Sequence, residues 1–334
     1  MSQGEAAWLS ALMAGFGSTI TGSGVVVGIG DDAAVLALPA GERLVATVDM
    51  VVEGQHFTHS GPGASTPEDI GWHALAVNLS DLAAMGARPL WVLCSLGVPP
   101  GLPPEFARRL ASGMAELAAP LGVRIVGGNL ARVSAGLVVD ITALGAVGQA
   151  LRRDGARPGD LVCVTGNLGR AAAGLALAQA GRGADAVTGP LLAALRRPQP
   201  RVRAGVALGG AAGQLHAACD ISDGLAADLG RVCDASGVGA ELWRPALPVD
   251  LATRTAADRL GQDPLAWAVH GGEDYELLLA VPPAAASAVG ALLESVDTPL
   301  AVVGAFREEP GLYLGDGPGR DLRPLAGDGW DPFA

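Results

Sequence analysis

Short apolar runs alternate with helical segments along almost the whole sequence, and this alternation limits the folds that the chain can adopt. The runs 161–165, 217–221 and 276–281 have the length and composition of buried strands. Longer segments with helix signals stand between such runs, among them 67–85 and 104–121, each of which begins with Pro. Alternating strands and helices predict an α/β (α+β) fold in which helices cover the faces of sheets.

The length of 334 residues fits two domains better than one small module. Half of the residues are hydrophobic but only 4% are aromatic, so the core must consist mainly of Ala, Val and Leu. The apolar pattern breaks near 150–158, where the charged stretch LRRDG stands. We therefore expect an N-terminal domain of residues 1–150 and a C-terminal domain of residues 151–334.

The sequence contains no lysine, so all 22 basic residues are arginines. A Walker A loop, a Schiff-base enzyme and a Ser-x-x-Lys hydrolase each need a lysine amine, and all three are excluded. The sequence also lacks HExxH, GxSxG and Cys–His signatures, so zincins and hydrolase triads have no support.

The formal net charge of −12 argues against a nucleic-acid or acidic-membrane partner, because phosphate groups attract positive surfaces. No apolar run approaches the ~18 residues of a membrane span. The first basic residue is Arg43, so the start of the chain lacks the charged region of a signal peptide. The cysteines form no CxxC pair, and we expect free buried thiols in a cytoplasmic protein. They are Cys94, Cys163, Cys219 and Cys233.

Acidic clusters stand at the ends of five predicted segments, where α/β proteins place ligand groups. Carboxylates gathered at several such ends would repel one another unless cations lay between them. Mg²⁺ with a polyphosphate meets this need, because Mg²⁺ takes one or two carboxylates together with phosphate and water oxygens. Each cluster alone is equally compatible with an ordinary turn or helix cap; Asp223, for instance, could cap a helix beginning at Gly224. The clusters are Asp31 and Asp32, Asp49, Asp81, Asp220 and Asp223, and Glu273 and Asp274.

Two further patterns surround these clusters. Asn78 and Asp81 are three apart in a predicted helix, so they share a face, and a cation or an arginine should meet Asp81. The Gly-rich segments 28–30 and 127–129 are predicted turns, which either let a phosphate approach the backbone or serve only as tight turns.

Six motifs are distributed along the chain: GIGDDAAVL (28–36), VDMVVEGQHF (48–57), AVNLSDLAAMGARP (76–89), CDISDGLAADL (219–229), GGEDYEL (271–277) and GWDPF (329–333). Together they resemble the thiamine-monophosphate kinases, a family of the aminoimidazole-ribonucleotide-synthetase-like superfamily. The resemblance runs from residue 28 to residue 333. The motifs GIGDD and SDGL occur across the superfamily, whereas the long AVNLSDLAAMGA block together with GGEDYEL is specific to this family.

The resemblance implies the ATP-dependent phosphorylation of thiamine monophosphate to thiamine diphosphate, the final step of thiamine diphosphate biosynthesis, with several Mg²⁺ ions. It also implies a homodimer in which the N-terminal domains, which bind ATP and Mg²⁺, pair across a shared β-barrel. The C-terminal domain would be an α/β domain.

The resemblance further implies roles for individual residues. Asn129 stands where many members have Asp, so its amide would offer one negative charge fewer. Val48 stands where Thr is frequent, so it could contact a metal only through its carbonyl oxygen. The implied metal ligands are Asp32, Thr47, Val48, Asp49, Asp81, Asn129, Asp220 and Asp223. The implied ATP contacts are Gly128, Asn129, Arg153 and Ser222, and the implied thiamine phosphate contacts are His56, Glu273 and Trp330.

The chemistry agrees with these implications. The acceptor is itself a phosphate with a second pKa of about 6, so it is ionised near neutral pH and needs no general base. Bridging Mg²⁺ ions and an arginine can bring two anions together for direct in-line transfer without a phosphoenzyme. Two alternatives stay open: an ATP-dependent synthetase of the same superfamily that acts on a carbonyl oxygen, and a nucleotide- or thiamine-binding regulator without turnover.

Overall fold

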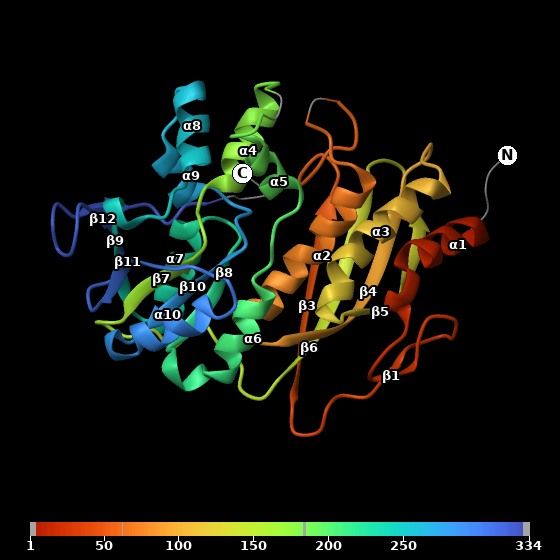
Figure 1. Cartoon of the computed structure of the whole chain (residues 1–334), viewed down its shortest axis with the longest axis horizontal. Helices are drawn as coiled ribbons and strands as arrows, with labels where there is room; N and C mark the ends of the chain where they lie inside the picture. The colour runs from red at the N-terminus through yellow and green to blue at the C-terminus, as the bar shows by residue number, and fades with distance from the viewer. Residues whose placement is uncertain (1–4, 62, 183–184, 330–334) are drawn as a thin grey trace. The chain divides into compact units, whose positions relative to one another are not determined.

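The computed structural model describes residues 5–61, 63–182 and 185–329. The chain divides into two compact units, the first formed by residues 1–82 and 88–148, the second by 83–87 and 149–334. Each unit combines helices with a β-sheet, which confirms the predicted α/β (α+β) class (Figure 1).

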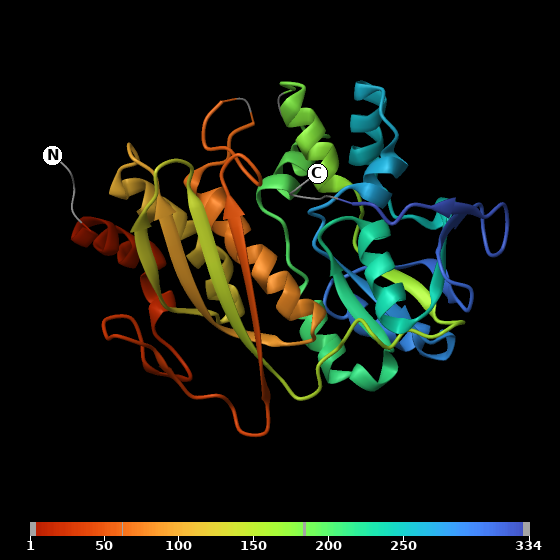
Figure 2. The same ribbon diagram turned by 180° about the vertical axis from the view of Figure 1, so that it is seen from behind.

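The first unit is built on a four-stranded sheet with the strand order β3-β6-β4-β5. Helices α2 (Pro67–Ala84) and α3 (Pro104–Leu121) lie over one face of this sheet (Figure 1), and α1 (Glu5–Phe16) packs against α3. The opposite face has no helix over it in the described part of the chain (Figure 2). The strands are β3 (Arg43–Val52), β4 (Arg88–Val98), β5 (Arg124–Arg132) and β6 (Val138–Val147), and the short pair β1 (Val25–Val27) and β2 (Val35–Leu36) forms a separate ribbon.

Helix α2 begins and ends where its sequence signals stand. The Oγ1 of Thr66 accepts a hydrogen bond from the Asp69 amide at 3.1 Å, and Oδ2 of Asp69 accepts one from the Thr66 amide at 3.1 Å. This reciprocal pair satisfies amides that the first turn leaves without helical partners. Gly86 stops the helix with a φ of +68°, a conformation that favours glycine.

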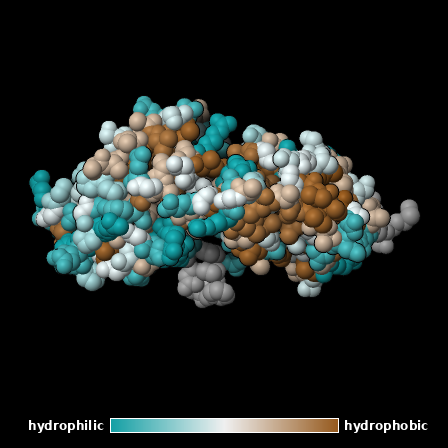
Figure 3. Space-filling model, turned by 90° about the horizontal axis from the view of Figure 1, so that it is seen from below, coloured by the Kyte–Doolittle hydropathy of each residue, from teal (hydrophilic) through white to brown (hydrophobic). Residues whose placement is uncertain are grey.

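The uncovered face of the sheet carries exposed apolar side chains. On β3, Leu44, Val48 and Met50 alternate with inward residues and are 54%, 59% and 54% exposed. Hydrophobic residues also gather over this unit in the space-filling view from below (Figure 3). Contiguous apolar patches are uncommon on the surfaces of monomeric proteins.

The second unit is built on a seven-stranded sheet with the strand order β13-β12-β9-β11-β7-β10-β8. Its pairs are antiparallel except β12 with β9. The strands are β7 (Leu161–Thr165), β8 (Ala217–Ile221), β9 (Gly239–Trp243), β10 (Glu276–Val281), β11 (Leu300–Arg307), β12 (Leu312–Gly315) and β13 (Arg323–Leu325). The α-helices are α4 (Arg170–Gln179), α5 (Gly189–Arg196), α6 (Val202–Gly210), α7 (Leu225–Ser236), α8 (Leu251–Leu260), α9 (Pro264–His270) and α10 (Ala286–Glu294).

The central strands of this sheet are buried on both faces. Val162 and Val164 of β7 belong to one hydrophobic cluster, whereas Cys163 between them belongs to the cluster on the other face. Double burial explains why these strands read as continuous apolar runs. The cysteines are buried and free, as predicted: Cys94, Cys163, Cys219 and Cys233. No helix of the described chain is long and apolar enough to cross a membrane.

Candidate active site

The first unit brings Thr47 and Asp81 together. Thr47 lies on β3 and Asp81 on α2, and the Thr47 hydroxyl donates a hydrogen bond to Oδ2 of Asp81 at 2.5 Å. The sequence predicts a cation or an arginine beside Asp81, whereas the partner within the protein is this hydroxyl. A threonine satisfies one lone pair of the carboxylate and leaves its charge available for a cation.

Asn78 fixes the backbone of Asp49. The Asp49 amide donates to Oδ1 of Asn78 at 2.9 Å, and Nδ2 of Asn78 donates to the Asp49 carbonyl at 3.3 Å and to Ala74 O at 3.0 Å. Asn78 is fully buried, whereas Asp49 is exposed. The predicted common face of Asn78 and Asp81 is therefore confirmed, and both side chains are directed at β3.

Strand pairing separates Asn129 from Asp49. Asn129 pairs with Ser95, which pairs with Asp140, which in turn pairs with Met50 on the uncovered face. Side chains directly opposite on neighbouring strands share a face, so Asn129 and Asp49 project from opposite faces. Two strands also lie between them, or about 14 Å at a strand spacing of about 4.8 Å. One copy of the chain therefore does not bring Asn129 to Asp49.

The Gly-rich segment 127–129 was expected to be a turn, and this prediction is wrong. The segment lies in β5, where a side chain on Gly128 would place a Cβ 1.8 Å from the Cys94 carbonyl oxygen. Glycine is needed here because the two strands approach each other closely. The segment 28–30, in contrast, follows β1 directly and leads into the turn that carries Asp32.

The remaining N-terminal candidates are Asp32, Val48 and His56. Asp32 is exposed, and in the described chain no hydrogen bond or ion pair joins it to Asp49 or Asp81. Val48 pairs with Thr142 of β6. Because the Asp49 amide and carbonyl face Asn78, the alternation of an antiparallel ladder turns the Val48 carbonyl toward β6.

His56 is held in one tautomer. The Val52 amide donates to Nδ1 of His56 at 3.1 Å, so the ring proton of the neutral form is on Nε2. Burial lowers the pKa of His56. The side chain therefore offers a neutral N–H donor rather than a positive charge.

In the second unit, helix α7 organises the loop that carries Ser222 and Asp223. Oδ2 of Asp228 accepts hydrogen bonds from the amides of Ser222 and Asp223 at 3.0 and 3.1 Å. Arg231 donates to Oδ1 of Asp228 and to Oδ2 of Asp223. Burial raises the pKa of Asp228, against the opposing effects of Arg231 and the amide donors.

The alternative that Asp223 caps α7 is wrong. The cap position is Gly224, which has a φ of +115° and makes no side-chain hydrogen bond to the helix. Glycine is needed at this position because a Cβ would lie 2.9 Å from the His270 backbone. The Asp223 carboxylate pairs with Arg231 instead.

The loop that carries Glu273 packs against the Ser222 loop. The Glu273 amide donates to the Ser222 carbonyl at 2.7 Å, and the Tyr275 amide donates to the Ile221 carbonyl at 2.9 Å. Glu273 and Tyr275 both have a positive φ, 66° and 52°, which is costly for residues with a side chain and concentrates at functional sites. Burial raises the pKa of Glu273 to about 7.

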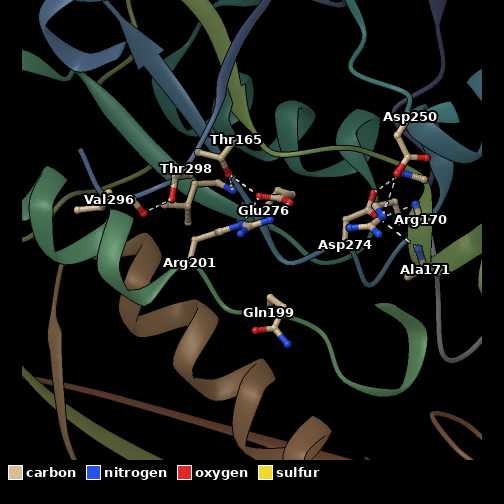
Figure 4. Close-up of polar contacts among 12 residues, drawn as sticks. Thr165, Arg170, Ala171, Gln199, Arg201, Asp250, Asp274, Glu276, Val296 and Thr298 are labelled. Carbon is tan, nitrogen blue, oxygen red and sulfur yellow. Dashed lines mark hydrogen bonds and ion pairs between the residues drawn. The ribbon is translucent and has the colours of Figure 1, made fainter. Parts of the chain in front are cut away.

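Asp274, between Glu273 and Tyr275, has a structural role. Its carboxylate accepts hydrogen bonds from the amides of Gly169, Arg170 and Ala171 at the start of α4 (Figure 4). Burial nevertheless raises its pKa to about 7, since the three amide donors only partly offset the loss of hydration. Asp274 therefore anchors the loop on which Glu273 stands.

Glu276, the residue directly after this loop, forms an ion pair with Arg201. Nε of Arg201 donates to Oε2 of Glu276 at 2.6 Å, and Thr165 donates to the same oxygen at 2.7 Å (Figure 4). The sequence analysis did not identify Arg201 and Glu276, nor Asp228 and Arg231. The last two were detectable, because they stand three apart in a predicted helix.

Asp220 and Arg153 are the remaining predicted site residues that the structure describes in the second unit. Asp220 is buried in β8, opposite Leu277 of β10. Arg153 is exposed, and its carbonyl accepts a hydrogen bond from Ser236 at 3.1 Å. The carboxylates of Asp228 and Asp220 add to burial in raising the pKa of Cys219, whereas Arg153 and Arg231 act in the opposite direction. Trp330 lies outside the described residues.

The oxygen donors suit a hard cation. Thr47, Asp49 and Asp81 offer hydroxyl and carboxylate oxygens on neighbouring elements. Among the residues that the structure describes, no three His, Cys, Asp or Glu side chains are arranged to hold a metal ion by themselves. A small carboxylate set matches Mg²⁺, which takes its other ligands from phosphate and water.

Comparison with known proteins decides the family. Residues 30–147 match the N-terminal domain model of AIR synthase related proteins, and residues 157–317 match the C-terminal domain model. The thiamine-monophosphate kinase of Salmonella typhimurium is 37% identical over 315 residues, which span 93% of each chain. The chain belongs to the thiamine-monophosphate kinase family.

Solved structures agree with this membership. The thiamine-monophosphate kinase of Stenotrophomonas maltophilia K279a has a TM-score of 0.81 and 39% identity over 94% of this chain and 97% of that chain. A structure of AaThiL complexed with AMPPCP and TMP has a TM-score of 0.76 and 29% identity over 88% of each chain. The Escherichia coli hydrogenase maturation protein HypE shares the fold, with a TM-score of 0.77 and 26% identity over 97% of each chain. Identity is thus higher to the family members than to this neighbour.

Proposed function

We propose that the chain transfers a phosphoryl group from ATP to thiamine monophosphate and forms thiamine diphosphate, the final step of thiamine diphosphate biosynthesis. The observation that carries this proposal is the relative that binds AMPPCP, an ATP analogue, together with thiamine monophosphate and aligns with 88% of this chain. Relatives named thiamine-monophosphate kinase, which are 34–41% identical to this chain, also support the proposal.

In each unit, the carboxylates would hold Mg²⁺, and the bound ions would supply positive charge to the phosphates. Thr47 positions the Asp81 carboxylate for this purpose, and Asn78 fixes the backbone of Asp49. Asp228 and Arg231 shape the loop of Asp223. The full proposed set is Asp32, Thr47, Asp49, Asp81, Asn129, Asp220 and Asp223; Val48 is left out because its carbonyl is turned toward β6.

We assign nucleotide contacts to Gly128, Asn129, Arg153 and Ser222. The amide of Ser222 is directed toward Asp228, and its carbonyl accepts from Glu273, so the position of its hydroxyl is set by the backbone on both sides. Arg153 is exposed and offers positive charge to phosphate.

His56, Glu273 and Trp330 are the proposed contacts of thiamine monophosphate. The Nε2–H of His56 is a neutral donor that suits a phosphate or a ring nitrogen. The ionised carboxylate of Glu273 would attract the thiazolium cation of the substrate. No residue is needed as a general base, because the acceptor phosphate ionises with a second pKa of about 6.

We further propose a homodimer that pairs through the uncovered sheet face of residues 1–150, with residues 151–334 as a separate α/β domain. Leu44, Val48 and Met50 support this, since an isolated chain would expose them to water. The metal role of Asn129 depends on this dimer, because one copy does not bring Asn129 to Asp49. Buried free thiols and the use of ATP favour the cytoplasm as the compartment.

The test is an incubation of the purified protein with ATP, Mg²⁺ and thiamine monophosphate, followed by chromatography of the thiamine species. Matched reactions contain free thiamine in place of the monophosphate, or EDTA. Thiamine diphosphate formed only from the monophosphate, and abolished by EDTA, is the expected result. ATP hydrolysis without thiamine diphosphate would favour the synthetase alternative, and nucleotide binding without hydrolysis would favour a regulator.

A further inference from the structure

Arg231 forms ion pairs with two carboxylates of different surroundings. From α7 it donates to Oδ1 of Asp228 and to Oδ2 of Asp223. Its own side chain is 45% exposed, whereas the Asp228 side chain is only 5% exposed. One guanidinium group thus joins a buried anchor to a partly exposed carboxylate.

The contact with Asp228 belongs to the fold. Asp228 also accepts the amides of Ser222 and Asp223, so its carboxylate cannot move without breaking the loop that it shapes. A buried carboxylate that loses its counter-ion is strongly destabilised. The contact of Arg231 with Asp228 is therefore expected to persist.

The contact with Asp223 is of a different kind. Asp223 is a proposed metal ligand, and a divalent cation that binds its carboxylate repels a guanidinium bound to the same oxygens. The Asp223 side chain is 25% exposed, so a cation can approach from solvent. Arg231 and Mg²⁺ therefore compete for Asp223.

Phosphate is the natural second partner for the guanidinium released in this way. Arginine offers five donors, of which the anchored contact with Asp228 uses only part. In a chain without lysine, arginine is the one side chain that is always positively charged and can face a polyphosphate. Arg153, the proposed nucleotide contact, accepts a hydrogen bond through its carbonyl from Ser236 on α7, the helix that carries Arg231.

We propose that Arg231 exchanges Asp223 for a phosphate oxygen of the nucleotide when Mg²⁺ binds Asp223, while Asp228 retains it. Before nucleotide binds, Arg231 acts as the counter-ion of Asp223; afterwards it is a direct nucleotide contact. This inference rests on the proposed kinase function and adds a binding residue to it.

The test measures the binding of Mg²⁺ alone and of Mg²⁺ with AMPPCP by calorimetry, for the unaltered protein and for Arg231→Gln. Without the Arg231 guanidinium, which competes for Asp223, the binding of Mg²⁺ alone should tighten by roughly threefold, the scale of an exposed ion pair. Loss of the phosphate contact should weaken the binding of AMPPCP by about tenfold, the scale of one charge-assisted hydrogen bond. Arg231→Lys should restore most of the nucleotide affinity.

Arg244→Gln is the matched control, because Arg244 forms an exposed ion pair with Asp316 at 3.0 Å and should leave both affinities unchanged. Opposite changes for the two ligands support the exchange. If Arg231→Gln weakens both, Arg231 only shapes the loop; if it changes neither, Arg231 contacts nothing that binds, and either result overturns the inference. An unaltered protein that binds no AMPPCP overturns the proposed function together with the inference.

Discussion

The side-chain amide of Asn78 makes with the Asp49 backbone both hydrogen bonds that a neighbouring strand would make. The Asp49 amide donates to Oδ1 at 2.9 Å, and Nδ2 donates back to the Asp49 carbonyl at 3.3 Å. β3 is the edge strand of its sheet, so these groups would otherwise face solvent. Helix α2 thus fixes the strand at the residue whose carboxylate is proposed to bind metal.

Replacement of Asn78 by Ala should remove this support. The free energy of unfolding should fall by about 2–3 kcal/mol, because buried hydrogen bonds are lost and backbone groups are left without partners. Chemical unfolding measures the change, with Ser112→Ala, an exposed hydroxyl on α3, as the control. An Asn78→Ala protein as stable as the control would contradict the role of the amide.

Replacement of Thr47 by Val should raise the Mg²⁺ concentration needed for half-maximal activity. Valine keeps the shape of threonine but cannot donate to Asp81, so the carboxylate loses the contact that positions it. We expect an increase of about tenfold, the scale of one charge-assisted hydrogen bond. Thr47→Ser keeps the hydroxyl and should behave like the unaltered protein; equal effects of the two substitutions would exclude this explanation.

Glu273 should make substrate binding depend on pH. Since the pKa of Glu273 is raised to about 7, the KM for thiamine monophosphate should fall as pH rises through 7 and the carboxylate ionises. In Glu273→Gln this part of the pH profile should vanish, whereas the titration of the substrate phosphate remains in both proteins. Identical profiles for the two proteins would contradict the assignment.

The same residue should affect stability in a defined direction. Between the ordinary glutamate pKa of 4.5 and the raised value of about 7, the folded protein holds the Glu273 proton that the unfolded chain has released. The stability contributed by this proton is present below pH 4.5 and is lost as pH rises through about 7. Thermal unfolding should therefore show Glu273→Gln to be more stable than the unaltered protein at pH 8 and equal to it near pH 4. An equal difference at both pH values would contradict a titration effect.

Replacement of Arg201 by Met should destabilise the second unit by about 3–5 kcal/mol, because it leaves the buried Glu276 carboxylate without a counter-ion. The double variant Arg201→Met with Glu276→Gln should recover a large part of this loss. Arg88→Met breaks an exposed pair with Glu42 and should cost less than about 1 kcal/mol in the same unfolding experiment. A double variant no more stable than the single one would show that the pair contributes through packing alone.

Replacement of Met50 by Glu should convert the proposed dimer to a monomer. Met50 is 54% exposed on the uncovered sheet face, and a charge buried there in an interface would have no partner. Sedimentation velocity measures the change, and Leu175→Glu on α4 should leave the dimer intact. A monomeric unaltered protein, or a dimeric Met50→Glu protein, would contradict the proposed interface.

The sequence predicted those elements whose burial leaves a clear pattern. Strands β7, β8 and β10 lie at their predicted residues, because burial on both faces makes them short and mostly apolar runs. Helix α3 also matches its prediction, since Pro104 begins it and Gly122 ends it with a φ of +72°. Helix α1 was not predicted, because it is defined by packing on α3 rather than by a local signal.

Contacts between distant residues in the site could not be predicted. The helix spacing placed Asn78 and Asp81 on one face, but not their partners on β3, which lie 29 and 34 residues away along the chain. The segment at Gly128 was expected to turn because glycine favours turns, and only the neighbouring Cys94 backbone shows why a strand needs glycine there. Similarly, Asp223 could be seen as a cap until Arg231 was placed beside it.

The most direct test of the central claim follows the γ-phosphoryl group of labelled ATP through a single turnover with thiamine monophosphate and Mg²⁺. Direct transfer predicts that the label passes from ATP to thiamine diphosphate and that denatured protein carries none at any time. Label on the protein that then appears in thiamine diphosphate would contradict in-line transfer. Label released only as inorganic phosphate, with no labelled thiamine diphosphate, would contradict the kinase function itself.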